Sequence, residues 1–220
     1  MSAPLALVYR GPAARPGACS DAVATLLRSS PLGFDVRYVG PHGELPLTPG
    51  SLAGAAIYAR PGGGELKPAY RRMRKHRAAI RDYVAAGGRY LGFCLGGYLA
   101  GATPGFGLLP GDTDQYVASD GATTHSVDDT VVEVTWRGDR RRMFFQDGPV
   151  FLLEAEAQST VLAWYRNDGI AAVVVPFGAG RVAVVGPHPE ATPDWYADCG
   201  LQNQPAFDLG HDLIETVMNP

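Results

Sequence analysis

In the first half of the chain, short runs of apolar residues alternate with segments of helical periodicity. We expect strands at 5–9, 35–39, 55–58 and 90–93, the first and last of them buried, and helices at 20–27 and 67–86. Alternation of short strands with helices is typical of a parallel α/β sheet. In such a sheet, functional residues gather where the strands end at their carboxyl side.

The pattern changes in the second half, where apolar strands follow one another through turns. We expect strands at 131–136, 143–146, 160–165, 171–175 and 181–185, and a closing helix at 208–218. Turn residues such as those at 137–140 and 177–180 separate these strands. The pattern therefore predicts a mainly parallel sheet with helices on both faces and an antiparallel β extension.

Composition limits the class of protein further. The chain has 220 residues, of which 46% are hydrophobic, and a formal net charge of −3. A single domain spanning 1–220 is the simplest organisation for this length. No apolar stretch is long enough to cross a bilayer, and the first residues lack the features of a signal peptide. We therefore expect no membrane partner and a cytoplasmic location.

Cysteine, histidine and basic residues exclude several other functions. The three cysteines, Cys19, Cys94 and Cys199, have no spacing typical of a disulfide framework or a zinc site. The histidines at 42, 76, 125 and 211 are scattered, and we expect no metal and no cofactor. The basic segment 71–77 lacks interleaved aromatic residues, and we interpret it as a solvated helix face rather than a nucleic-acid site.

The segment Gly92-Phe93-Cys94-Leu95-Gly96-Gly97 carries the strongest chemical signal. It follows a predicted strand and precedes a predicted helix, so Cys94 is expected at a sharp strand-to-helix turn. A nucleophile at such an elbow needs small neighbours because its backbone is strained. The amino end of the following helix favours a thiolate over a thiol. This pattern predicts a cysteine nucleophile.

A second motif, Gly186-Pro187-His188-Pro189-Glu190, follows the last predicted strand. The two prolines suppress helix formation here, so His188 and Glu190 are expected in an extended loop. Alternate residues of an extended segment point the same way, which would let Glu190 orient the imidazole of His188. Cys94, His188 and Glu190 together predict a nucleophile, a base and an orienting carboxylate.

The pairing of a G-x-C-x-G elbow with a late His-Pro-Glu, in this chain order, resembles the class I glutamine amidotransferase superfamily. The string 87–98, with Pro61-Gly62-Gly63 before it and the motif at 186–190 after it, is most similar to the amidotransferase-like domain of biotin-protein ligases. That domain is found at the N-terminus of eukaryotic ligases and as stand-alone bacterial proteins. The resemblance extends from about 5 to 190 and implies a flavodoxin-like three-layer α/β sandwich.

The resemblance also implies roles for individual residues. Cys94 would be the nucleophile, His188 the general base and acid, and Glu190 the orienting residue. Backbone amides of the loop that contains Gly62 and Gly63, with the amide of Leu95, would form the oxyanion hole. Glutamine-hydrolysing members often carry glutamine four residues after the cysteine, where this chain has Tyr98. This departure puts glutamine in doubt as the substrate but leaves the thiol chemistry intact.

Three functions are compatible with these residues. The first is a cysteine-dependent amide hydrolase or amidotransferase that acts on a small-molecule amide or acyl substrate through a thioester. If it released ammonia, a synthetase or ligase partner would be needed, because no P-loop or second catalytic domain is visible. The alternatives are a non-catalytic binding or regulatory module that retains the fold, and a peptidase-like hydrolase.

Overall fold

The computed structural model describes residues 3–14 and 16–219. Eleven strands join one sheet, and nine of them form a continuous path in the order β2-β1-β3-β4-β11-β10-β9-β6-β7. β5 and β8 pair with each other, and β8 joins the path through β10. The sheet therefore has a parallel half that ends at β11 and an antiparallel half that begins at β10.

The parallel half consists of β1 (Leu5–Tyr9), β2 (Asp35–Val39), β3 (Ile57–Arg60), β4 (Arg89–Phe93) and β11 (Gly180–Val185). Adjacent strands here are all parallel, including the central pair β4 and β11. Their side chains are almost all buried, except on the edge strand β2, as expected for a sheet covered on both faces.

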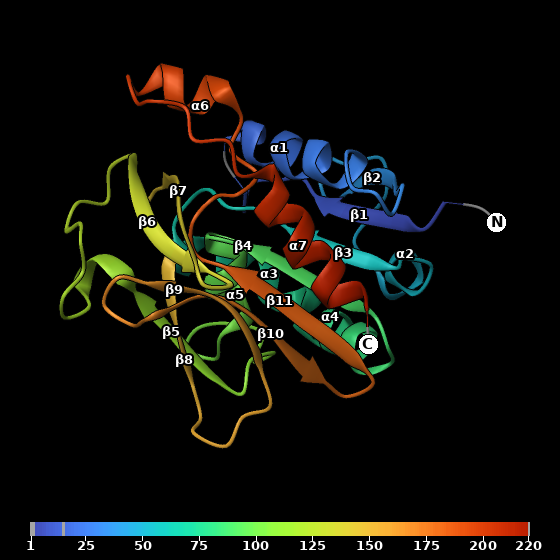
Figure 1. Cartoon of the computed structure of the whole chain (residues 1–220). Coiled ribbons are helices and arrows are strands. Elements are labelled where there is room, and N and C mark those ends of the chain that lie inside the picture. The colour runs from blue at the N-terminus through green and yellow to red at the C-terminus, as the bar shows by residue number, and fades with distance from the viewer. Residues whose placement is uncertain (1–2, 15, 220) are drawn as a thin grey trace.

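Helices cover both faces of the parallel half (Figure 1). On one face α1 (Gly17–Arg28) packs against α7 (Phe207–Met218). On the other face α2 (Pro49–Ala53) contacts α4 (Arg77–Ala85), and α3 (Leu66–Met73) contacts α5 (Leu95–Ala100). A single 3₁₀ turn, η1 (Arg74–His76), separates α3 from α4. Two hydrophobic clusters fill the layers above and below the sheet.

The antiparallel half contains two hairpins and two added strands. Its members are β5 (Gly111–Gln115), β6 (Thr130–Trp136), β7 (Asp139–Phe145), β8 (Pro149–Leu153), β9 (Thr160–Tyr165) and β10 (Ile170–Phe177). A short 3₁₀ turn, η2 (Tyr116–Ala118), follows β5, and α6 (Pro193–Asp198) precedes the last helix.

The expected fold class is confirmed: a mixed α/β sheet has helices on both faces and an antiparallel extension. The single helix expected at 67–86 is instead interrupted at η1. The sequence patterns also missed α2, α6, β5 and β8. None of the helices in the described ranges is long and apolar enough to span a membrane.

Candidate active site

Cys94 lies at the elbow between the central strand β4 and helix α5. Its backbone has φ 45° and ψ −106°, a region that non-glycine residues rarely adopt. The Cys94 amide donates a hydrogen bond to the carbonyl of Val185 on the neighbouring strand β11, at 2.9 Å. The Cys94 side chain is only 7% exposed. Strain of this kind persists when the surroundings fix it, and it often marks functional residues.

Two glycines make the elbow sterically possible. A Cβ on Gly92 would lie 2.6 Å from the carbonyl oxygen of Gly96, and a Cβ on Gly96 would lie 2.0 Å from the carbonyl oxygen of Arg60. Both distances are shorter than real Cβ contacts, so the chain needs glycine at both positions. The small neighbours expected around Cys94 therefore have a specific steric reason.

His188 and Glu190 follow β11, which lies directly beside β4. Nδ1 of His188 is 2.8 Å from Oε1 of Glu190, and both side chains are buried. The backbone amide of His188 donates to the carbonyl of Phe144 at 2.8 Å, which fixes the loop to β7. Since β4 and β11 are parallel neighbours, Cys94 and His188 leave the sheet at the same edge.

The pKa of His188 reflects its coupling to both partners. Burial lowers the pKa of the ring, but the charges of Glu190 and Cys94 and hydrogen bonding to both raise it to about 10. Both partners therefore favour the protonated form of the imidazole. Oε2 of Glu190 is buried without a partner among the described residues, so the carboxylate is directed at His188 through one oxygen.

The loop after β3 closes over the cysteine and the histidine. A Cβ on Gly62 would lie 2.9 Å from Cε1 of His188 and 3.3 Å from Cβ of Cys94, so a side chain at this position would press on both residues. Gly63 and Gly64 have φ values of 87° and 91°, which favour glycine. This loop lies where an oxyanion hole would be needed, although its role stays a prediction.

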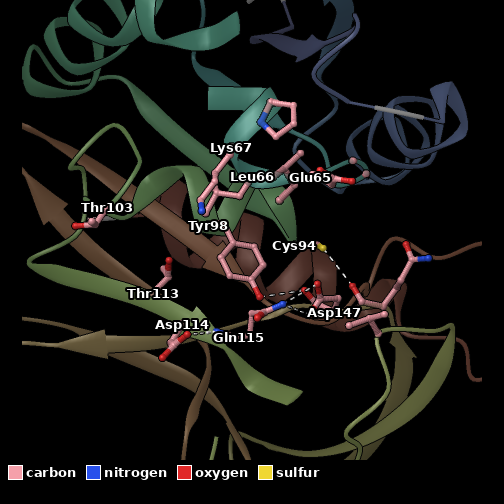
Figure 2. Close-up of a pocket in the computed structure, with 16 residues that line it drawn as sticks. Glu65, Leu66, Lys67, Cys94, Tyr98, Thr103, Thr113, Asp114, Gln115 and Asp147 are labelled. Atoms are coloured by element: carbon pink, nitrogen blue, oxygen red, sulfur yellow. Dashed lines mark hydrogen bonds between the residues drawn. The ribbon is translucent and has the colours of Figure 1, made fainter. Parts of the chain in front are cut away.

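A cavity of about 610 Å³ opens beside Cys94. The loop after β3, the start of α3, and α5 form one side, and β5 with the turn after β7 forms the other (Figure 2). Its lining residues are Gly63, Gly64, Glu65, Leu66, Lys67, Pro68, Cys94, Leu95, Tyr98, Thr103, Thr113, Asp114, Gln115, Val127, Gln146 and Asp147. Among the residues expected at the site, Gly63, Cys94, Leu95 and Tyr98 therefore line the cavity.

Tyr98 reaches across the cavity to the turn after β7. Its hydroxyl donates to the carbonyl of Asp147 at 3.1 Å, and the Asp147 carboxylate accepts from the side-chain amide of Gln115 at 3.0 and 3.1 Å (Figure 2). The Cys94 thiol donates to the carbonyl of Gln146 at 3.5 Å. Asp147 itself has φ 44°, a second strained position beside the same cavity.

Sequence reasoning missed the wall formed by β5 and Asp147. The letters Gly-Asp-Thr-Asp-Gln at 111–115 contain no apolar side chain, so neither the apolar pattern nor its alternation indicates a strand. β5 is held by its pairing with β8 rather than by buried side chains of its own. The one signal in the sequence is the group of acidic and amide side chains at 111–115, which follows the Cys94 motif.

The aromatic residues near His188 form a cover rather than a pocket wall. The rings of Phe144 and Trp195 pack edge-on against the His188 imidazole at centroid distances of 5.9 and 5.4 Å. Neither residue lines the cavity. The Tyr196 hydroxyl accepts from the amide of Phe144 and donates to the carbonyl of Gln204, both at 2.9 Å. These contacts fix α6 beside His188 and keep water from the ring.

The described residues of the loop at 10–18, with Cys19 and His125, lie away from the cavity. Of the loop at 10–18, no described residue lines it, and Arg15 is outside the described residues. Cys19 is buried at the start of α1, and burial together with Glu190 and Cys94 raises its pKa to about 12, so it is a poor nucleophile. His125 contacts the carbonyl of Val117 instead of the cavity. No cluster of three or more potential metal ligands is found in the described ranges.

Solved structures define the class of fold. A glutamine amidotransferase aligns with a TM-score of 0.61 and 19% identity, over 89% of this chain and 95% of its own. A proposed GMP synthase component from Thermoplasma acidophilum aligns with a TM-score of 0.62 and 10% identity, over 99% and 94%. A β-galactosidase aligns over 98% of this chain but only 30% of its own, with a TM-score of 0.56 and 16% identity. The fold is therefore that of class I glutamine amidotransferase-like proteins.

A comparison with models of protein families assigns the chain to one family. The family described as biotin-protein ligase, N terminal, matches residues 5–114, which is half of the chain. The chain belongs to this family. The matched part contains Cys94 and the loop after β3 but ends before His188 and Glu190. No match was found among curated proteins.

Proposed function

We propose that this amidotransferase-like protein is an amide hydrolase or amidotransferase that uses Cys94 as its nucleophile. The observation that carries the proposal is the buried 2.8 Å contact between His188 and Glu190, formed at the sheet edge where the strained Cys94 elbow opens into a cavity. A structural cysteine would need neither the strain nor a buried, charged partner.

The proposed chemistry proceeds in two steps. The sulfur of Cys94 attacks the carbonyl carbon of a carboxamide while its proton is held on His188, and the tetrahedral oxyanion lies against the amides of Leu95 and the Gly62–Gly63 loop. His188 then protonates the departing amine, the carbon–nitrogen bond breaks and a thioester remains. Water attacks the thioester with His188 as base, which releases a carboxylic acid and restores the thiol.

Glu190 would act through His188 rather than on the substrate. Because its carboxylate holds Nδ1, the other ring nitrogen, Nε2, is left for the sulfur and the leaving group. If the acceptor of the amine is another molecule, a synthetase or ligase partner would receive the ammonia. Binding without turnover is the competing function, and it is favoured by Tyr98, whose ring fills part of the cavity beside the sulfur.

Mass-spectrometric labelling tests this proposal. We would replace the exposed Cys199 by alanine to remove background and treat the protein near neutral pH with iodoacetamide and with a glutamine-like diazoketone. We expect Cys94 to be modified much faster than Cys19, and His188→Ala to slow its modification by about 100-fold, the usual scale of acid–base assistance. Glutamine chemistry is supported only if the diazoketone also reacts.

Two controls make the result interpretable. Cys94→Ala should remove the fast modification while leaving thermal unfolding nearly unchanged, since the substitution removes only one sulfur atom. His211→Ala, on α7 where the ring contacts the end of α1 and not the cavity, should leave the rate of Cys94 modification unchanged. Modification of Cys94 no faster than that of an unfolded peptide thiol would favour the binding module.

A further inference from the structure

The wall opposite α3 carries an excess of negative charge. Four charged side chains line the cavity: Glu65 and Lys67 at the start of α3, and Asp114 and Asp147 on the other side. Glu65 and Lys67 offset each other in charge. Within residues 3–14 and 16–219, neither Asp114 nor Asp147 forms a salt bridge. Two carboxylates that form no ion pair among the described residues therefore line the same cavity as the candidate nucleophile.

Asp147 is built into a fixed position. Its carboxylate accepts both hydrogen bonds from the Gln115 amide, its carbonyl accepts from Tyr98, and its backbone is in the left-handed region. The next residue, Gly148, has no room for a Cβ, which would lie 2.3 Å from the carbonyl oxygen of Gly186. The carboxylate is therefore preorganised rather than mobile, as a recognition group should be.

The surroundings of Asp147 favour a cation. Burial raises the pKa of its carboxyl, and the hydrogen bond from Gln115 offsets part of that effect. A neutral amide satisfies hydrogen bonding but leaves the charge of the carboxylate uncompensated. The Tyr98 ring lines the same cavity, with its hydroxyl end toward Asp147 (Figure 2), and a cation bound there gains further from an aromatic ring.

We propose that this cavity selects carboxamides that carry a positively charged amine on the side remote from the scissile carbonyl, with Asp147 as the main recognition residue and Asp114 as the second. The proposal rests on the proposed function of Cys94. The cavity volume of about 610 Å³ leaves room for a substrate longer than a single amino acid. Bond making and breaking remain as described above, with water as the only co-reactant.

Matched chloroacetamides test the charge preference. The probes are N-(2-aminoethyl)- and N-(4-aminobutyl)chloroacetamide, their uncharged N-propyl and N-pentyl counterparts, and chloroacetylglycine as the anion. The Cys94 sulfur displaces chloride in each case, and intact-mass kinetics gives the second-order rate. After correction for the rates with free cysteine, we expect one cationic probe to exceed its neutral counterpart by about tenfold and the anion to be slowest.

Aspartate variants test which residues cause the preference for cationic probes. Asp147→Asn should reduce the cationic-to-neutral ratio toward one, and Asp114→Asn should reduce it partly. Asp139→Asn, an exposed aspartate in the β6–β7 hairpin, should leave the ratio unchanged. Because Asp114→Asn alters only a side chain at the cavity, it tests the proposal even if Asp147→Asn does not fold.

The outcomes separate this proposal from the proposed function. Fast modification of Cys94 with no charge preference, or a preference that survives in both variants, would overturn cation recognition and keep the nucleophile. Absence of any selective reaction at Cys94 with all probes would instead overturn the nucleophile. A preference for cationic probes that is lost in Asp147→Asn and retained in Asp139→Asn supports both the nucleophile and cation recognition.

Discussion

Glu190 and Cys94 together raise the pKa of His188, and the charge state of this ring has consequences for stability. The folded-state pKa of about 10 lies above the ordinary histidine value of about 6.5. The protonated ring therefore stabilises the folded protein, fully below pH of about 6.5, and this contribution is lost as pH rises toward about 10.

Replacing Glu190 by glutamine should lower the pKa of His188, because burial continues to disfavour the charged ring while the carboxylate is gone. Nuclear magnetic resonance of the imidazole nitrogens across a pH series measures this shift. Urea unfolding should show that the wild type loses more stability than Glu190→Gln between pH of about 6.5 and about 10. Equal losses would mean that Glu190 does not hold the proton on His188.

Gly62 offers a second test at the level of one residue. Gly62→Ala brings a methyl group within 2.9 Å of the His188 ring, so we expect the rate of Cys94 modification to fall by at least about tenfold. Gly54→Ala is the matched control, because a Cβ there meets nothing within 4 Å and its φ of −88° suits alanine. Modification kinetics of both variants measures the difference. An unchanged rate in Gly62→Ala would place His188 outside the reaction.

Among the elements, the β6–β7 hairpin is fastened to α7 by charged groups. Arg141 contacts Asp208 through two hydrogen bonds of 2.6 and 2.9 Å, and hydrogen bonding to Arg141 is the main reason that the pKa of Asp208 is lowered. A lowered pKa stabilises the fold above the ordinary aspartate value of about 3.9 and ceases to do so as pH falls.

A double-mutant cycle of Arg141→Gln and Asp208→Asn should give a coupling of up to about 1 kcal/mol at pH of about 7, since both groups are partly exposed to solvent. The coupling should weaken progressively at pH values below the ordinary aspartate value of about 3.9, as Asp208 becomes protonated. Chemical unfolding across this range of pH measures it. A coupling that persists at low pH would show that packing, rather than charge, joins the hairpin to the helix.

Tyr196 on α6, whose hydroxyl accepts from the Phe144 amide, predicts a loss of both stability and reactivity. Tyr196→Phe removes the acceptor of the buried Phe144 amide, which should cost about 1 to 3 kcal/mol of unfolding free energy. Since Phe144 also holds the backbone of His188, the rate of Cys94 modification should fall as well. Unfolding and modification are measured on the same protein samples. A loss of stability with unchanged reactivity would confine α6 to a structural role.

The elements also show what a sequence can predict. Strands β1 and β2 are recognised to the residue because β1 is an apolar run that follows Pro4, and β2 alternates charged with apolar residues and ends at Gly40. The Cys94 elbow and the His188–Glu190 pair follow from local rules for glycine and proline. The wall with Gln115 and Asp147 does not, because β5 is polar and owes its place to pairing with a distant strand. Patterns along the chain describe local preference, whereas that wall depends on long-range pairing.

For the whole molecule, the continuous sheet predicts one cooperative unit. β10 and β11 pair along six positions and join the parallel and antiparallel halves, so we expect one unfolding transition. Far-ultraviolet circular dichroism reports on both halves, and the fluorescence of Trp136 and Trp164 reports on the antiparallel half. The two curves should coincide. Separate midpoints would divide the chain into two domains instead of the one expected.

Stability and reactivity should be separable in the same molecule. Leu213 is fully buried on α7, on the face of the sheet opposite α3 and α5. Leu213→Ala should cost about 2 to 5 kcal/mol of unfolding free energy. We expect the rate of Cys94 modification per folded molecule to be unchanged. Denaturant titration followed by labelling under folding conditions checks both statements.

The division of the sheet into two halves affects which parts of the site can be changed independently. Cys94 and His188 follow strands of the parallel half, whereas Asp114 and Asp147 belong to β5 and to the turn after β7 in the antiparallel half. No strand carries both groups, and the turn after β7 contacts Cys94 and Tyr98 through backbone carbonyls, so the side chains at 114 and 147 can change while these contacts are kept. The proposed nucleophile and the proposed recognition groups can thus vary separately, and a library of variants at positions 114 and 147 is the natural place to redirect the protein.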